Sequence, residues 1–164
     1  DFETALKEWK PLAESGHSSA QNNLGLMYDD GTGVPQVDNE AAKWYTLAAE
    51  QGFLLAQYNL ALLYENGRGV SQDYKEAIRL YILAAEQGYA MAQTNLGFIY
   101  YNGHGVLADY IMAHMWYSVG AANGNEIGAE NREIMAKEMT WEDISKAEAM
   151  ARVCMNSKYE KCGY

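Results

Sequence analysis

The chain has 164 residues and a net charge of −10 at neutral pH. A chain of this length can bury a sizeable core, and its negative charge argues against binding to nucleic acid or to an anionic membrane surface. No apolar run approaches the roughly 20 residues that a membrane-spanning helix needs, so membrane insertion is not expected. The charge itself has two interpretations: it keeps the protein in solution, or it attracts a basic partner.

From residue 16 onward the sequence repeats itself with a period of 36 residues, in copies that occupy 16–51, 52–87 and 88–123. Each copy has an Ala-Gln-x-Asn-Leu segment, a tyrosine, a Gly-x-Gly-Val loop and a glycine-terminated ending at the same offsets. The segments begin at Ala20, Ala56 and Ala92, the tyrosines are Tyr28, Tyr64 and Tyr100, and the loops begin at Gly31, Gly67 and Gly103. A fixed period of this length indicates stacked units that bury their apolar faces only against one another.

The middle copy shows what one unit is expected to fold into. Apolar residues fall at helical spacing from Leu54 to Glu65, and Gly67 permits the left-handed conformation that closes a helix. A second helix is predicted from Asp73 to Gln87, and Gly88 ends it. Its apolar stripe is Ala77, Leu80, Tyr81 and Ala84. Each unit is therefore predicted to be a helical hairpin.

Residues 124–164 depart from the period and are predicted to be capping helices and a tail. Arg132 replaces a core leucine, and no Gly-x-Gly loop follows. Thr140 with Asp143 three residues later has the form of a capping box. It predicts a last helix over about 141–154, whose buried face carries Ile144, Ala147, Ala151 and Cys154.

Both cysteines of the chain, Cys154 and Cys162, lie in its last eleven residues. They form a disulfide that closes a short loop, which implies an oxidising compartment, or they are incidental thiols of a cytosolic protein. Their pairing at the end of the last helix favours the disulfide. The mass of the intact protein with and without reductant distinguishes the two.

The repeated pattern resembles the Sel1-like repeat, a relative of the tetratricopeptide repeat, over residues 16–124. Residues 1–15 resemble the second helix of a preceding unit whose first helix is missing. The resemblance implies an all-α fold, with residues 1–164 forming a single right-handed α/α solenoid domain whose first helices line a concave face. It also implies an adaptor in complex assembly, of a kind that is often bacterial and often exported.

Comparing the copies indicates where a partner could bind. Positions that recur in all copies are explained by packing, whereas positions that vary on one helix face are free to contact a partner. One such stripe, with spacing 3, 4, 3 on the first helices, is largely apolar or aromatic in the second and third copies. Such a groove suits a peptide or helix of a protein partner. The predicted partner-binding residues are Asn22, Leu55, Tyr58, Leu62, Glu65, Met91, Thr94, Phe98 and Tyr101.

The large side chains of this stripe carry two different expectations. Leu26, Leu62 and Phe98 are all large and apolar, so they are either ordinary core or groove contacts. Tyr58 and Tyr101 have polar counterparts in the other copies, so we expect them to be exposed. Replacing both tyrosines with alanine is then expected to weaken partner binding with little change in stability.

No catalytic or metal-binding pattern is found in the sequence. The three histidines are His17 in the first copy and His104 and His114 in the third, and they do not have the spacing of a metal site. The Gly-x-Gly loops follow helices rather than strands, which argues against phosphate binding. No cofactor, metal or enzymatic activity is therefore predicted.

The leading hypothesis is a scaffold or adaptor that binds a protein segment in its concave groove, and the alternative is a cell-envelope enzyme or enzyme accessory with an unrecognised site. A third possibility is a fragment whose binding surface is completed by further units upstream. The chain begins at Asp1 without an initiator Met. From the cysteine pair and the resemblance we expect a periplasmic or secreted protein whose signal peptide has been removed, with a cytoplasmic location as the alternative.

Overall fold

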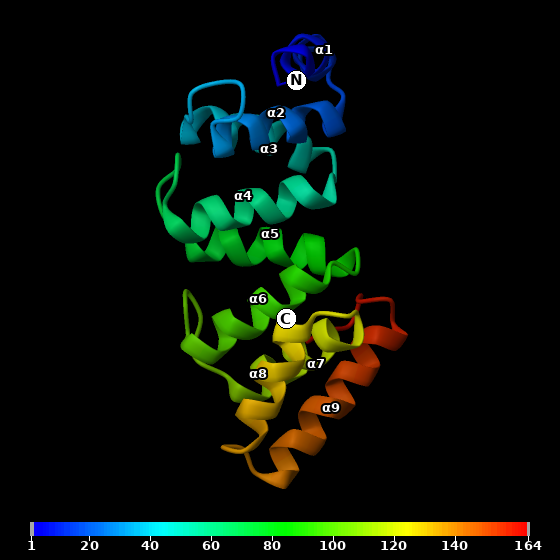
Figure 1. Cartoon of the computed structure of the whole chain (residues 1–164). Helices are drawn as coiled ribbons and strands as arrows, with labels where there is room; N and C mark the ends of the chain where they lie inside the picture. The colour runs from blue at the N-terminus through cyan, green and yellow to red at the C-terminus, as the bar shows by residue number, and fades with distance from the viewer. Residues whose placement is uncertain (1, 164) are drawn as a thin grey trace. The chain divides into compact units, whose positions relative to one another are not determined.

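The computed structural model describes residues 2–163, which form nine helices and no strand. The helices are α1 (Phe2–Glu14), α2 (Ser18–Asp30), α3 (Asp38–Glu50), α4 (Leu54–Asn66), α5 (Tyr74–Glu86), α6 (Ala90–Asn102), α7 (Tyr110–Ala122), α8 (Glu126–Ala136) and α9 (Trp141–Asn156), labelled in Figure 1. The all-α prediction is confirmed, and the predicted helix ends agree with the observed ones to within two residues. The chain forms two compact units, Asp1–Leu80 and Tyr81–Tyr164, which are described one at a time.

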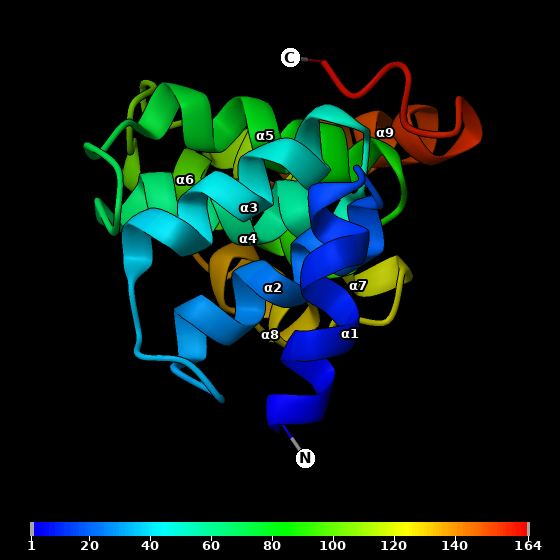
Figure 2. The same ribbon diagram turned by 90° about the horizontal axis from the view of Figure 1, so that it is seen from above.

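In the first unit, α1 lies across α2, α2 pairs with α3, and α3 packs on α4 (Figure 2). The core between α1, α2 and α3 contains the buried side chains of Leu24, Met27 and Trp44. Leu6 and Trp9 of α1 pack against this core and are partly buried. The helix that precedes the first full copy therefore covers apolar surface of that copy, as stacked units require.

The glycines at the ends of the first helices act as the sequence predicts. Gly31, Gly67 and Gly103 have φ values of 70°, 66° and 69°. In each case the glycine N–H donates to a carbonyl of the preceding helical turn, which satisfies a carbonyl that the helix end leaves open. The loop that follows is then tied back to the first helix, for example by the bond of 3.0 Å from the Asp73 N–H to the Tyr64 carbonyl.

The second glycine of the middle loop is needed for a different reason. Gly69 has a φ of 67°, and a Cβ added to it would lie 2.2 Å from the carbonyl oxygen of Asp38. The loop of the second copy thus contacts the first residue of α3 backbone to backbone. Only glycine combines this left-handed conformation with so close an approach.

The glutamine of the Ala-Gln segment explains why that segment recurs. Its side-chain amide donates to a carbonyl in the last turn of the helix that precedes it in the chain. The three bonds are Gln21 to Ala13 (3.1 Å), Gln57 to Ala49 (3.4 Å) and Gln93 to Ala85 (3.0 Å). All three glutamines are buried, so their side-chain amides need hydrogen-bond partners inside the protein. One residue type therefore joins successive helices in every copy.

A polar network in the first unit joins the first copy to the loop of the second. The Arg68 guanidinium bonds the carboxylates of Asp29 at 2.5 Å and Asp38 at 2.7 Å. Asp29 also accepts a hydrogen bond of 3.3 Å from the hydroxyl of Tyr45, which is fully buried. Burial raises the pKa of Tyr45 well above its ordinary value of 10, and the nearby Asp29 carboxylate raises it further.

This pKa shift predicts a loss of stability at alkaline pH. In the unfolded chain Tyr45 ionises near pH 10, whereas in the folded chain it keeps its proton to higher pH. Its contribution to stability is therefore complete below pH 10 and is lost as the pH rises above 10. In Tyr45→Phe, the free energy of unfolding should fall less steeply between pH 9 and 11, as measured by urea unfolding. Tyr110→Phe, at an exposed tyrosine, is the control. An unchanged alkaline slope in Tyr45→Phe would contradict the prediction.

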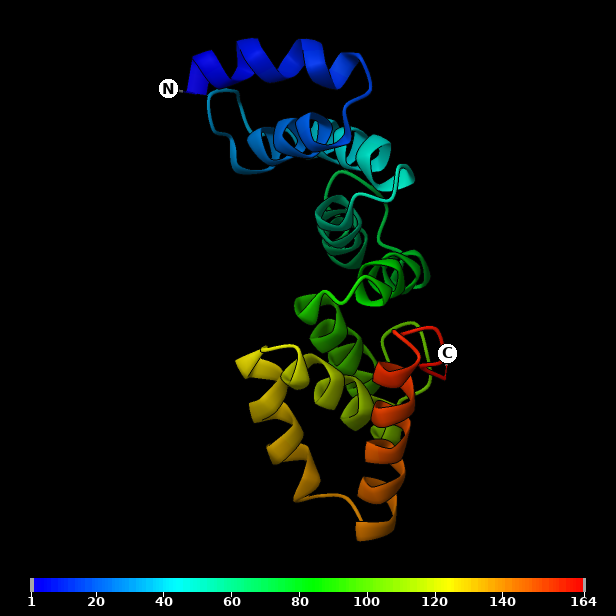
Figure 3. The same ribbon diagram turned by 90° about the vertical axis from the view of Figure 1, so that its right-hand side faces the viewer.

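In the second unit, α6 pairs with α7, and α7 lies between α8 and α9 (Figure 3). Tyr117 of α7 is buried together with Ala113 and Met135. Its ring lies directly against α6, where a Cβ added to Gly97 would come within 2.5 Å of it. The small residue at 97 thus sets how closely α6 approaches Tyr117.

The C-terminal part confirms Thr140 as the N-cap of α9, with Asp143 as its partner. The Thr140 hydroxyl accepts a hydrogen bond from the Asp143 N–H at 3.2 Å and donates one to the Asp143 carboxylate at 2.7 Å. Ala147, Ala151 and Cys154 are buried on the predicted face of α9, and Ile144 is half-buried.

A disulfide joins Cys154 to Cys162 and holds the tail against the second unit. Tyr159, in the closed loop, exchanges hydrogen bonds of 2.9 and 3.1 Å with the side-chain amide of Asn123, just after α7. Asn123 in turn donates to Gln93 of α6 at 2.8 Å. The tail is therefore connected by hydrogen bonds, through Asn123, to α6 of the third copy.

Candidate functional site

The structure divides the predicted partner-binding stripe into exposed and buried positions. Leu55, Met91, Phe98 and Tyr101 are 38–46% exposed. Leu62 and Glu65 are half-buried. Leu26 is 37% exposed, so the alternative that Leu26 and Phe98 are ordinary core is wrong.

Three predicted contact residues are instead buried: Asn22 at 1%, Tyr58 at 8% and Thr94 at 6% exposure. The expectation of an exposed Tyr58 is wrong. Because this side chain is buried, we expect Tyr58→Ala to lower the stability of the fold and not only to weaken the binding of a partner. These residues occupy the fifth position of α2, α4 and α6, and other parts of the chain cover that position. The Asn22 side chain, for example, accepts a hydrogen bond of 3.5 Å from Asn59 of α4.

The burial of Thr94 has a clear cause in the second unit. A Cβ at Gly120 would lie 2.5 Å from the Thr94 hydroxyl oxygen, and a Cβ at Gly128 would lie 2.8 Å from it. Thr94 thus fills the space that these two glycines leave at the end of α7 and the start of α8. This variable position is thus filled by packing against α7 and against α8, and α8 belongs to the closing segment that follows the copies.

The exposed aromatic residues of α6 form one wall of a groove in the second unit, and α8 with the turn after it forms the other. The cavity in this groove has a volume of about 180 Å³. We call it the α6–α8 groove, and its lining residues are Phe98, Tyr101, Tyr117, Asn131, Ile134, Met135 and Glu138. Phe98 and Tyr101 are thus brought together as the stripe predicted, and their neighbours come from a helix that the repeat pattern does not describe.

The floor and rim of the α6–α8 groove are held by defined contacts. Burial raises the pKa of Tyr117, on the floor, to about 12, with a smaller contribution from Tyr101. At the rim, the Phe98 ring meets the His104 ring edge-on with centroids 5.9 Å apart. The Phe98 carbonyl accepts a hydrogen bond of 2.9 Å from Asn102, which secures the end of α6. An apolar groove with an aromatic rim fixed in this way is suited to receive a bulky apolar side chain.

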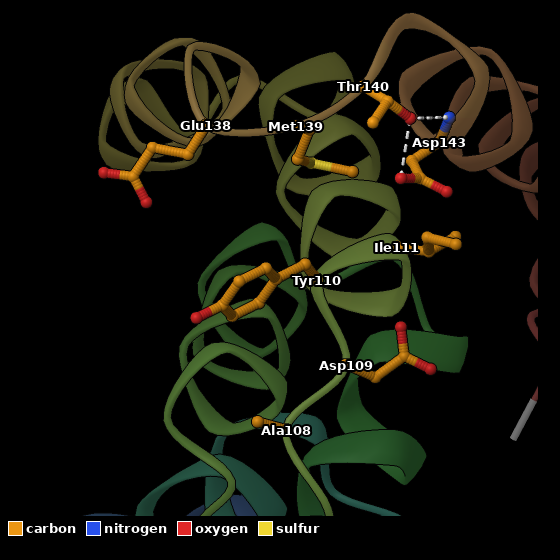
Figure 4. A pocket seen from close by; sticks show the side chains of 8 residues that line it. All are labelled: Ala108, Asp109, Tyr110, Ile111, Glu138, Met139, Thr140 and Asp143. Carbon is orange, nitrogen blue, oxygen red and sulfur yellow. Dashed lines mark hydrogen bonds between the residues drawn. The ribbon is translucent and has the colours of Figure 1, made fainter.

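A second, larger hollow adjoins the groove through a pair of tyrosines. The rings of Tyr101 and Tyr110 stack with centroids 5.5 Å apart, and Glu138 lines both spaces. We call this space of about 400 Å³ the acidic hollow; its lining residues are Ala108, Asp109, Tyr110, Ile111, Glu138, Met139, Thr140 and Asp143 (Figure 4).

The second wall of the groove could not be found by comparing the copies, because α8 lies where the repeat decays. One signal was nevertheless present in the sequence. Ile127 and Ile134 are seven residues apart in α8, so they share a face of the helix. They are 61% and 59% exposed in the structure. Exposed isoleucines on one helix face indicate an interaction surface more directly than variation between copies does.

The histidines and carboxylates do not form a metal site within the described residues, where no group of three or more His, Cys, Asp or Glu side chains could hold an ion. His114 is buried, and burial lowers its pKa, an effect to which the nearby Arg132 adds. A His whose neutral form is favoured in this way fits a packing role within α7. No helix in the described part of the chain is long and apolar enough to span a membrane.

A protein-family model described as the Sel1 repeat matches residues 18–53, 54–89 and 90–125. The chain belongs to the Sel1 repeat family. The matched repeats begin two residues after the predicted copies, at the first residues of α2, α4 and α6. The α6–α8 groove therefore lies between the first helix of the third Sel1 repeat and the segment that follows the repeats. A comparison with curated proteins gives no match.

Solved structures of Sel1 repeat proteins resemble this chain. The Escherichia coli protein c5321, a protective antigen present in uropathogenic strains that displays an SLR fold, is 42% identical with a TM-score of 0.74. The match covers 76% of this chain but only 27% of c5321. A Sel1 repeat protein from Oxalobacter formigenes is 40% identical with a TM-score of 0.69, over 78% of this chain and 96% of that one.

Proposed function

We propose that this Sel1 repeat chain is a protein-interaction module whose α6–α8 groove binds a bulky apolar side chain of a protein or peptide partner. The observation that carries the proposal is the groove itself. It places Phe98 and Tyr101, 46% and 38% exposed, opposite Ile134, which is 59% exposed. Large apolar side chains that converge on a cavity and remain accessible to solvent are typical of interaction sites.

Two further considerations support the proposal. Proteins of the Sel1 repeat family are commonly scaffolds for protein interactions and generally lack catalytic activity. The groove also combines apolar walls with few polar groups, which suits an apolar anchor of a peptide.

We also infer that the protein works in an oxidising compartment outside the cytoplasm. The disulfide between Cys154 and Cys162 closes the tail, and disulfides persist in such compartments. The similar c5321 is described as a protective antigen, which agrees with an exported protein, although the match spans about a quarter of c5321.

The proposal can be tested by selecting binders from a phage-displayed library of random 16-residue peptides on the full chain. The Kd of the enriched peptides should rise at least about tenfold in Phe98→Ala, because truncating an aromatic hot-spot anchor costs about 2 kcal/mol or more of binding free energy. Ile134→Ala should have an effect of the same kind. Isothermal titration calorimetry measures both.

The matched control is Val153→Ala, which truncates an exposed apolar side chain of α9 that does not line the groove. Circular dichroism should give the same helical content for all three variants. Peptides that bind equally well to the chain and to Phe98→Ala, or a library that yields no binder, would contradict the proposed site.

A further inference from the structure

We infer that the partner segment carries a lysine or arginine next to its bulky apolar side chain, and that Glu138 binds this cation. The inference rests on the proposed function, because it assigns the chemistry of the partner at the same groove. It identifies Glu138, at the junction of the α6–α8 groove and the acidic hollow, as the residue that selects a basic partner over an acidic one.

Glu138 differs from the other two carboxylates of the acidic hollow in that it does not cap a helix. It lies in the turn after α8, it is exposed, and within residues 2–163 it forms no ion pair. The other two carboxylates of the acidic hollow cap helices. Asp109 accepts a hydrogen bond of 2.9 Å from the Met112 N–H at the start of α7, and Asp143 bonds Thr140 at the start of α9.

The surroundings of Glu138 suit a cation. Figure 4 shows Glu138 and Tyr110 toward one side of the acidic hollow, and Asp109 and Asp143 toward the other. Tyr110 stacks on Tyr101, which lines the groove. An ammonium or guanidinium group that pairs with Glu138 can therefore also lie over an aromatic face, and such contacts are attractive at partly desolvated sites. Arginine fits best, because its planar group pairs with a carboxylate and stacks on a ring at once.

The charge around the two spaces is of one sign. No lysine or arginine is among the residues that line the groove or the hollow, whereas three carboxylates are. The chain as a whole carries a net charge of −10. An acidic partner would bring its carboxylates against Glu138 with no lining cation to offset the repulsion, so charge complementarity favours a basic partner.

The experiment uses the same phage-displayed library and compares the enriched peptides with the unselected ones. Peptides whose binding requires Phe98 should be enriched in Lys or Arg within a few residues of an aromatic residue or leucine. Their Kd should rise about two- to fivefold in Glu138→Gln at low salt, as expected for the loss of an exposed ion pair. The difference between the chain and this variant should shrink as sodium chloride rises from 50 to 500 mM, because salt screens exposed charges.

The control is Glu130→Gln, which removes an exposed carboxylate of α8 that lines neither space. It has the same effect on net charge as Glu138→Gln, so a general effect of charge would change both variants equally. Equal effects in the two variants, or Phe98-dependent peptides without basic residues, would overturn the inference and leave the proposed function intact. A failure of all peptides to bind through Phe98 would overturn both.

Discussion

Gly69→Ala is expected to lower the free energy of unfolding of the first unit by about 2–4 kcal/mol. Part of the loss comes from the backbone, since an alanine at a φ of 67° costs roughly 1–2 kcal/mol. The rest comes from the clash of the new Cβ with the Asp38 carbonyl, 2.2 Å away. The obstacle is backbone at the start of α3, so no side-chain rotation can relieve it. Urea unfolding followed by circular dichroism measures the loss.

Gly52→Ala separates the two causes. Gly52 has a φ of 80°, but a Cβ added there meets no atom within 4 Å. This variant should therefore show only the backbone cost of roughly 1–2 kcal/mol. If both variants lost the same stability, the close approach of the loop to α3 would be unimportant, and the role given to Gly69 would be wrong.

The periodic part of the fold could be predicted because each copy contains the local signals that form its helices and end them. Apolar spacing predicted the helices, and the left-handed glycines at 31, 67 and 103 predicted where the first helices end. These are local properties of the chain, so they do not depend on what packs around a unit. The recurrence of Gln21, Gln57 and Gln93 was also visible, but its cause is a hydrogen bond to a carbonyl of the preceding helix, which spacing along the chain does not reveal.

The candidate site was only half predictable. Variation between copies correctly drew attention to Phe98 and Tyr101, but it also selected Asn22, Tyr58 and Thr94, which are buried. A variable position is one that no common packing rule fixes. It can still be covered, because the segments that cover it vary as well, as Gly120 and Gly128 do around Thr94.

The second wall of the groove, formed by α8, could not be predicted from the repeat pattern. The sequence predicts that residues 124–164 close the stack. The packing of α8 and α9 on α7, however, is a tertiary contact that the local sequence pattern does not specify. Because α8 meets the exposed face of the third Sel1 repeat, a groove with walls of different origin arises at the end of the repeats. The same closing segment supplies Glu138, so it provides both the apolar wall and the carboxylate to which we assign partner choice.

Replacing Cys154 and Cys162 together with alanine is expected to lower the free energy of unfolding of the second unit by about 2–3 kcal/mol. A cross-link that closes so short a loop removes roughly this much entropy from the unfolded chain. In the folded chain, the loss of the disulfide frees the tail that carries Tyr159. We expect its hydrogen bonds to Asn123, and the packing of its ring beside Gly88, to weaken as a result. Urea unfolding of the double variant measures the stability.

Amide hydrogen exchange shows where the stability is lost. Peptides from the end of α9 and from residues 88–93 and 119–125 should exchange faster in the double variant, whereas those from α2 and α3 should keep their rates. Tyr159→Phe keeps the disulfide but removes the hydroxyl, so it should raise exchange around Asn123 alone. Two free thiols in the intact mass of protein prepared under oxidising conditions would contradict the disulfide. Unchanged exchange near Asn123 in the double variant would show instead that Tyr159 stays in place without the cross-link.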